Sequence, residues 1–407
     1  MDAADDPARL PIDVDALPLV RAALAMRPAL RARHDEIEQA QRLPADLVEE
    51  MRAAGFYRMV VPRAIGGLEV DPLTYLRVNE ALAEGCGAVG WNICNNNIIQ
   101  LVSLGLPDDG IDEIYGRGNA VTMAGTAIQG GGKAVAVPGG YRITGRWGFG
   151  SGCMESNWML GSFQVLDDGE PRRLPDGTPQ HWRCLFRREE TEIVAGSWNV
   201  DGMRGTGSFD WTATDVFVPT HRIMDHPPGA LDAQWARWPG VGYALPVFAW
   251  VGPHHCSVIT GIARNGIEAL IELARTKTPR GFRGGLVSEQ PQVQYDVARA
   301  DSMLNAGRAY RSATITELWN TVAAGQATTI EQRARCRLAA SFAADCAREA
   351  MDLMYRHGGS TSFRRDTRIA QCWRDLQVVG QAGQVMPEWY PLGGRILLGL
   401  EPSPRLT

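Results

Sequence analysis

The stretch Gly145–Gly152 reads GRWGFGSG and closes a longer run, YRITGRWGFG, in which apolar and polar side chains alternate. The apolar face of that run carries Tyr141, Ile143, Trp147 and Phe149. A period of two predicts a strand with one buried face. The strand ends among glycines that enclose a single serine. This ending indicates either an ordinary turn or a place where a flat polar molecule lies against the backbone, because glycine has no Cβ to obstruct it.

Composition narrows the class of protein. The chain has 407 residues, of which 45% are hydrophobic and 21% charged, with a formal net charge of −5. These values predict a globular protein with more than one packed unit. An acidic balance argues against a nucleic-acid or anionic-membrane partner. The N-terminus MDAADDPARL is acidic and no run of 18 apolar residues occurs, so we expect neither a signal peptide nor a membrane anchor.

The cysteines and histidines do not suggest a metal site. Eight cysteines are scattered through the chain without a Cys-x-x-Cys pair. This usage favours reduced thiols in a cytoplasmic protein and argues against structural zinc. His254 and His255 are adjacent, so on a helix their side chains would diverge by about 100°. We therefore expect no bound metal.

The pattern divides the chain into three parts, which we predict as an N-terminal helical domain (1–118), a central β domain (119–229) and a C-terminal helical domain (230–407). LPADLVEEMRAAGF has helical spacing and stops at Gly55, whereas 119–229 shows alternation and repeated turn signals. A capping-box pattern, Thr329 with Gln332, begins a long late helix. The expected fold class is α+β, with a β-barrel-like centre of six to eight strands and a final four-helix bundle.

Four stretches in this order resemble the acyl-CoA dehydrogenase fold over essentially the whole chain. They are GFYRMVVPRAIGGLEVDPLTYL, GGYRITGRWGFGSG, GMRGTGSFD followed by VFVP, and GGSTSF with RIAQCWRDL after it. More closely, the chain resembles the two-component flavin-dependent monooxygenases of that fold, the group D hydroxylases. The resemblance implies that a separate NAD(P)H-dependent flavin reductase supplies FMNH2 or FADH2. It also implies O2 as co-substrate, a C4a-hydroperoxyflavin, and oxygenation of an aromatic, heterocyclic or amine small molecule.

The same resemblance implies a flavin site. Trp147 and Phe149 would form one wall of the isoalloxazine site, and Ser151 would donate a hydrogen bond near its N5/C4a edge. The remaining contacts would come from Met123, Gly125, Thr126, Gly150, and, from a neighbouring subunit, Arg280 or Arg283, Gly358 and Gly359. A flavin shared between subunits implies a homo-oligomer, and the family suggests a tetramer. The ordinary alternatives are aromatic core residues, a turn-capping serine and solvated arginines.

The choice between dehydrogenase and monooxygenase depends on a catalytic base. Acyl-CoA dehydrogenases remove an α-proton with a carboxylate nine residues beyond the arginine of an Arg-Asp pair. Here that pair is Arg374-Asp375 and the position is Gly383, while the other family location, 243–266, contains no acid. The monooxygenase is therefore the leading hypothesis. A dehydrogenase or oxidase of this fold is the alternative, followed by a non-catalytic flavin binder.

The substrate side departs from the family pattern, which carries histidines in two regions where this chain has amides. GWNICNNNIIQ contains Asn95 and Asn97, and WRDLQVVGQAGQ contains Gln377 and Gln381. Amides do not take protons near neutrality, which favours an amine, a sulfur centre, an electron-rich heterocycle or an acidic enol over a simple phenol. We expect Ser151, Asn97, Gln377 and His254 (or His255) to be catalytic. The expected substrate cavity is formed by Trp91, Asn95, Phe248, Trp250 and Gln381, each of which could instead be plain core.

Overall fold

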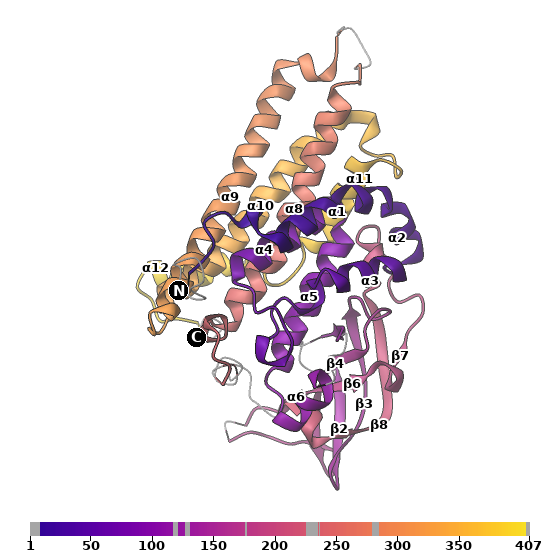
Figure 1. The fold of residues 1–407 in the computed structure, drawn as a ribbon, viewed down its shortest axis with the longest axis vertical. Coiled ribbons are helices and arrows are strands. Elements are labelled where there is room, and N and C mark those ends of the chain that lie inside the picture. The colour runs from indigo at the N-terminus through magenta and orange to yellow at the C-terminus, as the bar shows by residue number, and fades with distance from the viewer. Residues whose placement is uncertain are drawn as a thin grey trace.

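A computed structural model describes residues 9–116, 121–126, 131–175, 177–224, 235, 237–278 and 285–403. Figure 1 shows the long C-terminal helices together at one end of the molecule and the sheet at the other, with N-terminal helices between them. These N-terminal helices are α1 (Pro18–Ala32), α2 (His34–Ala40), α3 (Ala45–Ala53), α4 (Pro72–Gly85), α5 (Gly87–Ser103) and α6 (Asp108–Tyr115). The three-part organisation expected from the sequence is thus confirmed as a fold, while its boundaries stay predictions.

Local signals explain where these helices begin and end. The Asp71 carboxylate accepts hydrogen bonds from the backbone N–H groups of Leu73 and Thr74, and Pro72 occupies the first turn of α4, where its missing N–H costs nothing. After α3, Gly55 adopts φ +86°, the left-handed conformation that glycine tolerates. The glycine stop predicted for this helix is confirmed.

The central domain is a mixed sheet. Its strands are β1 (Met123–Gly125), β2 (Gly132–Val137), β3 (Gly140–Gly150), β4 (Trp158–Asp167), β5 (Glu170–Pro171), β6 (His181–Arg187), β7 (Glu192–Ile193), β8 (Phe209–Pro219) and β9 (Ile223–Met224). The strand order is β7-β8-β3-β2-β4-β6-β9, with β1 and β5 also paired to β4. Within the described residues the path stays open, but side chains of β6 and β8 meet where Phe186 packs edge-on against Trp211. The expected barrel is therefore a curled, open sheet.

Along strand β3, the predicted alternation of inward and outward side chains holds as far as Trp147. Trp147 pairs with Trp211 of β8, but the next pair is Gly150 with Phe209, so β3 carries one extra residue there. Such a bulge redirects side chains by one position. Phe149, at φ +60°, consequently points out of the sheet core and is 64% exposed.

The C-terminal domain is the expected four-helix bundle, with a fifth short helix beside it. Helices α8 (Val247–Ala274), α9 (Pro291–Ala323), α10 (Ile330–Gly358) and α11 (Arg368–Val379) pack together, and α12 (Trp389–Leu397) lies against α10. The predicted capping box at Thr329 and Gln332 is present, with each side chain bonded to the other's backbone N–H. No helix in the described parts of the chain is long and apolar enough to cross a membrane.

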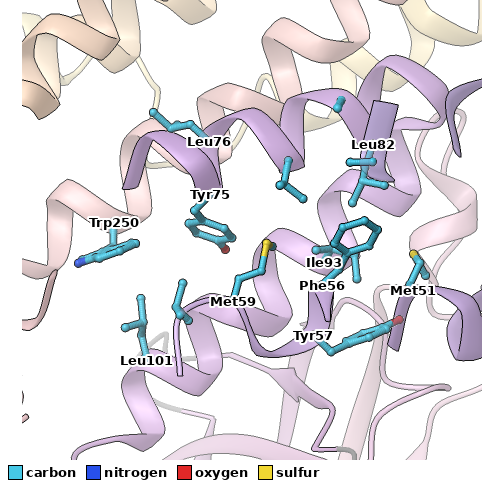
Figure 2. Close-up of a cluster of buried hydrophobic side chains, with 14 of the residues drawn as sticks. Met51, Phe56, Tyr57, Met59, Tyr75, Leu76, Leu82, Ile93, Leu101 and Trp250 are labelled. Atoms are coloured by element: carbon cyan, nitrogen blue, oxygen red, sulfur yellow. The ribbon is translucent and has the colours of Figure 1, made fainter. Parts of the chain in front are cut away.

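The N-terminal helices join the bundle through a shared core. Figure 2 shows Met51, Phe56, Met59 and Ile93 facing the underside of α4, with Tyr75 beside Trp250 of α8. Burial of this apolar surface fixes α4 and α5 against α8. All eight cysteines of the chain are buried free thiols.

Candidate active site

Ser151 lies in a tight turn just beyond β3, between the sheet and α5. Its backbone N–H donates to the carbonyl of Phe149 at 2.9 Å, and the N–H of Gly152 donates to the carbonyl of Thr206 at 2.9 Å. These two contacts fix the turn against the 203–208 loop. The Ser151 side chain is buried and faces α5 rather than solvent.

A line of hydroxyl groups extends from Ser151. Its Oγ lies 2.7 Å from Ser208 Oγ, which lies 2.7 Å from Thr206 Oγ1. Thr206 Oγ1 in turn donates to the carbonyl of Met203 at 2.8 Å. All three hydroxyl residues are buried. The GMRGTGSFD stretch, recognised only as a family resemblance, thus supplies two polar neighbours of Ser151 that sequence reasoning missed.

Trp91 and His255 cover the other side of Ser151. The Trp91 indole N–H donates to Ser151 Oγ at 3.1 Å, and the His255 ring stacks on the indole at a centroid distance of 4.8 Å. His255 Nε2 lies 3.3 Å from Asn95 Oδ1, and Asn95 Nδ2 donates to the carbonyl of Trp91 at 2.9 Å. Burial lowers the pKa of His255 to about 4. Of the residues expected near the substrate, Trp91 and Asn95 are the two that the structure brings to Ser151.

Asn92 is the unusual polar residue of this region. It is 4% exposed, and within the described residues neither its amide nitrogen nor its amide oxygen has a hydrogen-bond partner. It lines a water-sized cavity of about 10 Å³ with Ser151, Met123 and Glu155. A buried amide without partners is costly, so this position is suited to a bound group that offers both a donor and an acceptor.

Glu155 borders the same cavity but is turned toward the N-terminal segment. Its Oε1 accepts the backbone N–H of Leu43 at 3.1 Å and lies 3.4 Å from Arg42 Nε. Burial raises the pKa of this carboxyl to about 7, although Arg42 opposes the rise. Its oxygen is therefore held against residues 42–43 rather than directed at Ser151.

A larger groove of about 540 Å³ opens between the 200–201 segment and α11. Its lining includes Tyr355, Phe363, Trp373 and Gln377. Gln377 was expected at the site and lies on this groove, whereas Gln381 is exposed outside its lining. The volume falls in the range of ligand sites.

The two aromatic residues expected to form the flavin wall lie in different surroundings. Phe149 is exposed at the end of β3, in edge contact with Trp198 at 6.4 Å between centroids, which leaves a ring face accessible. Trp147 is 2% exposed, stacks on Trp211 at 4.3 Å and donates its indole N–H to the carbonyl of Ser162 at 2.8 Å. The structure thus places the Trp147 side chain in the sheet core, whereas its expected role in the flavin wall stays a prediction.

Three residues expected on the substrate or proton path are core residues instead. His254 is fully buried between Tyr75 and Trp250, and its two ring nitrogens face the carbonyls of Trp250 and Pro72. Burial lowers the pKa of His254 to about 3. Trp250 packs beside Tyr75 (Figure 2) and donates to the carbonyl of Gly242 at 3.0 Å. Phe248 is buried under the Arg337 guanidinium.

Asn97 is also a structural residue. Its amide nitrogen donates to the carbonyls of Phe56 at 2.8 Å and Ile93 at 2.9 Å, and its oxygen accepts the N–H of Val60 at 3.4 Å. With these bonds Asn97 ties α5 to the segment after α3. These bonds give Asn97 a packing role, while its expected catalytic role stays a prediction.

The other central-domain residues expected to contact a flavin are fixed by backbone interactions. The carbonyl of Met123 accepts the Asn96 amide at 3.0 Å, and the N–H of Thr126 donates to the carbonyl of Leu160 at 2.9 Å. Gly125 has φ +120°, and a Cβ there would come within 2.2 Å of the Leu160 carbonyl oxygen, so glycine is required. Gly150 is packed tightly against β8, where a Cβ would lie 2.9 Å from the Phe209 carbonyl oxygen.

The expected inter-subunit contacts are described only in part. Lys277 Nζ donates to the carbonyl of Gly358 at 2.5 Å and to Thr361 Oγ1 at 2.9 Å, and Gly359 has φ +53°. This ties the end of α8 to the turn between α10 and α11. Arg280 and Arg283 lie outside the described residues.

A separate polar cluster joins the three domains. The side-chain donor atoms of His34, Glu38 and Asp375 lie within 4.8 Å of one another. Asp375 Oδ1 accepts the N–H of Met203 at 2.6 Å, and Glu38 Oε1 accepts the N–H of Gly205 at 2.9 Å. Two arginines, Arg31 and Arg368, line the adjoining cavity, and their charge disfavours a cation there. We interpret the cluster as a tie between the domains.

Comparison with known proteins adds a family assignment to this geometry. A model described as "Acyl-CoA dehydrogenase, N-terminal domain" matches residues 20–107, and one described as "Acyl-CoA dehydrogenase, C-terminal domain" matches residues 254–385. Together the two models cover more than half of the chain.

Curated relatives and solved structures match over most of the chain. Indole-3-acetate monooxygenase of Pseudomonas putida is 29% identical over 376 residues, covering 92% of each chain. The oxygenase subunit HsaA of a flavin-dependent monooxygenase from Rhodococcus jostii (strain RHA1) is 28% identical over 361 residues, 86% of this chain and 90% of that protein. The crystal structure of 3-HSA hydroxylase from Rhodococcus sp. RHA1 superposes with a TM-score of 0.87 at 25% identity, covering 97% of this chain and 100% of that one.

Proposed function

The chain belongs to the acyl-CoA dehydrogenase family, and from this premise we propose that it is the oxygenase component of a two-component flavin-dependent monooxygenase. A separate flavin reductase supplies the reduced flavin, which the name "oxygenase subunit" of a relative supports. The substrate is a small molecule. We further propose a homo-oligomer, with a tetramer as the form to test, in a reducing, cytoplasmic setting that suits eight free buried thiols.

The observation that carries this proposal is the unsatisfied polar edge around Ser151. Asn92 has an unpartnered amide, and Phe149 offers an exposed ring face nearby in sequence. The flat rings of a flavin match an aromatic face, and the C=O and N–H groups at its edge can meet the Asn92 amide through a water in the cavity of about 10 Å³, which is too small for a ring. We propose Ser151 and Phe149 as flavin contacts, with Asn92 in contact through that water. When bound, the reduced flavin supplies the electrons that activate O2.

The dehydrogenase alternative lacks its base. Gly383 occupies the position at which the family's carboxylate is expected, and the acids of α8, Glu268 and Glu272, pair with arginines on the outside of the bundle. Glu155 borders the Ser151 cavity, but its oxygen is held by Leu43 and Arg42. Without a directed carboxylate, removal of an α-proton has no acceptor.

The hydrogen bonding of His255 indicates which polar group the substrate carries. The amide of Asn95 is oriented by its bond to the Trp91 carbonyl, so its oxygen faces His255 Nε2, which must then carry the hydrogen. Because burial keeps the ring neutral, Nδ1 holds a lone pair, and no described group donates to it. We propose that Nδ1 accepts a hydrogen bond from an O–H or N–H of an aromatic or heterocyclic substrate.

Stopped-flow absorbance tests the proposed activity and the role of Ser151 together. The protein is loaded anaerobically with reduced flavin and then mixed with O2, and the absorbance transient and the yield of H2O2 are recorded. Ser151→Ala should shorten the transient about tenfold or more and raise the H2O2 yield, because one polar contact to the flavin is lost. Ser302→Ala, on the exposed face of α9, serves as the matched control.

Two outcomes contradict the proposal. A wild-type protein that shows no transient with either FMNH2 or FADH2 is not an oxygenase of this kind. A protein that purifies with tightly bound oxidised flavin, which bleaches on addition of an acyl-CoA, is a dehydrogenase.

A further inference from the structure

In the line of hydroxyl groups formed by Ser151, Ser208 and Thr206, each hydrogen bond has a fixed donor and acceptor. The assignment follows from the number of protons available. A carbonyl oxygen only accepts, so the proton of Thr206 Oγ1 is given to the Met203 carbonyl. Thr206 has no second proton, and Ser208 must therefore donate across the 2.7 Å contact between them. Ser208 has then used its own proton, so Ser151 donates to Ser208.

The result is a serine whose proton is already committed. Ser151 Oγ gives its proton to Ser208 and accepts the Trp91 indole N–H at 3.1 Å. A hydroxyl oxygen has two lone pairs, so one remains, and among the described residues no further donor faces it. Ser151 can therefore accept a hydrogen bond from a ligand but has no proton to give. The inferred direction differs from the expectation that Ser151 donates to the flavin.

The fixed direction distinguishes the two redox states of a flavin. Reduced flavin carries an N–H at N5, whereas oxidised flavin has a lone pair at that atom. An obligate acceptor favours the first and repels the second. Resting on the proposed function, and with Ser151 taken to contact the N5 edge of the flavin, we propose that Thr206 and Ser208 are positioning residues that make Ser151 an acceptor and so select reduced over oxidised flavin.

Contacts of the 203–208 loop hold the Met203 carbonyl in place as the final acceptor of the line. The Met203 carbonyl that ends the line also accepts the Trp198 indole N–H at 3.2 Å, and the Met203 N–H is held by Asp375 of α11 at 2.6 Å. The line contains no titratable group. Its direction is therefore set by the number of protons and by the anchored carbonyl rather than by pH.

The test measures flavin binding rather than turnover. Dissociation constants for reduced flavin (anaerobic) and oxidised flavin are obtained by fluorescence titration for wild type, Ser208→Ala, Thr206→Val and Thr206→Ser. In Ser208→Ala, Ser151 recovers a free proton that it can direct at oxidised flavin. The preference for reduced flavin should fall about tenfold, the worth of one ordinary hydrogen bond. Thr206→Val should lower it in the same direction, and Thr206→Ser, which keeps a hydroxyl, should preserve it.

The outcomes separate this inference from the function on which it rests. If wild type binds no reduced flavin, the proposed function fails. If wild type prefers reduced flavin and both Ser208→Ala and Thr206→Val keep that preference, the function stands and the positioning role is overturned. Thermal melts identify any variant that does not fold; should Ser208→Ala be one, the comparison of Thr206→Val with Thr206→Ser decides alone, because those residues are nearly equal in size to threonine.

Discussion

At the scale of single residues, adjacent histidines on α8 have opposite surroundings. His254 is enclosed by Tyr75 and Trp250 and faces backbone carbonyls, whereas His255 stacks on Trp91 beside Ser151. The sequence could not separate them, because α8 is apolar on nearly every face and its pattern does not reveal which side meets the site. Only the packing of α4 and α5 against α8 decides.

The two histidines should respond differently to substitution. His254→Ala removes a fully buried ring and should lower the free energy of unfolding by about 3 kcal/mol in urea titrations. His255→Ala should raise KM and lower kcat while leaving the dissociation constant of reduced flavin within about twofold, because its Nδ1 is proposed to meet substrate. A loss of activity confined to the His254 variant, in protein that is fully folded, would reverse these roles.

At the scale of elements, the β3 bulge and the α5 amides show where pattern reading fails. The alternation of apolar and polar residues correctly placed Ile143 and Trp147 on the buried face of β3. The extra residue before Gly150 depends on the register between β3 and β8, and the sequence of β3 alone does not encode that register. The hydroxyl line likewise joins Ser151 to Ser208, 57 residues away along the chain. The capping box at Thr329 and the glycine stop at Gly55 were predicted from the sequence because both signals are local.

Asn97 gives an element-scale prediction. Asn97→Ala leaves the Phe56 carbonyl without the amide and unties α5 from the segment after α3. We expect the free energy of unfolding to fall by about 1–3 kcal/mol, the cost of leaving buried polar groups unpaired. Urea unfolding with Asn320→Ala, an exposed position on α9, as control checks this. Unchanged stability together with a selective loss of kcat would support the catalytic assignment.

At the scale of the whole molecule, the sequence predicted the order of helices, sheet and bundle well. Composition and period report burial averaged over whole segments, and the layers follow from that average. The junction of the three domains, around His34, Glu38 and Asp375, is also a feature of the whole molecule. Burial lowers the pKa of His34, but the carboxylates of Asp375, Glu38 and Asp35 raise it, and the net effect is a raised pKa. Burial raises the pKa of Glu38 to about 7 at this junction. Such long-range charge clusters have no signature in one chain segment.

Glu155 predicts how stability depends on pH. Its folded pKa of about 7 exceeds the ordinary 4.5, so the folded protein holds this proton more tightly than the unfolded chain. The stabilisation is present below pH 4.5 and is lost as the pH rises from 4.5 through 7, about 3 kcal/mol in all. Urea midpoints measured from pH 5 to 8 should fall less steeply in Glu155→Gln than in wild type. Glu170→Gln, at an exposed strand, should follow wild type; equal slopes for all three proteins would refute the assignment.

The eight free cysteines divide among the packed regions of the molecule. They are Cys86 and Cys94 around α4 and α5, Cys153 and Cys184 in the sheet domain, and Cys256, Cys336, Cys346 and Cys372 in the bundle. Since each thiol is shielded in the native fold, an alkylating reagent can modify it only while its surroundings open. Peptide-resolved mass spectrometry of a timed alkylation would therefore record the opening rate of each region separately, with no label introduced into the chain.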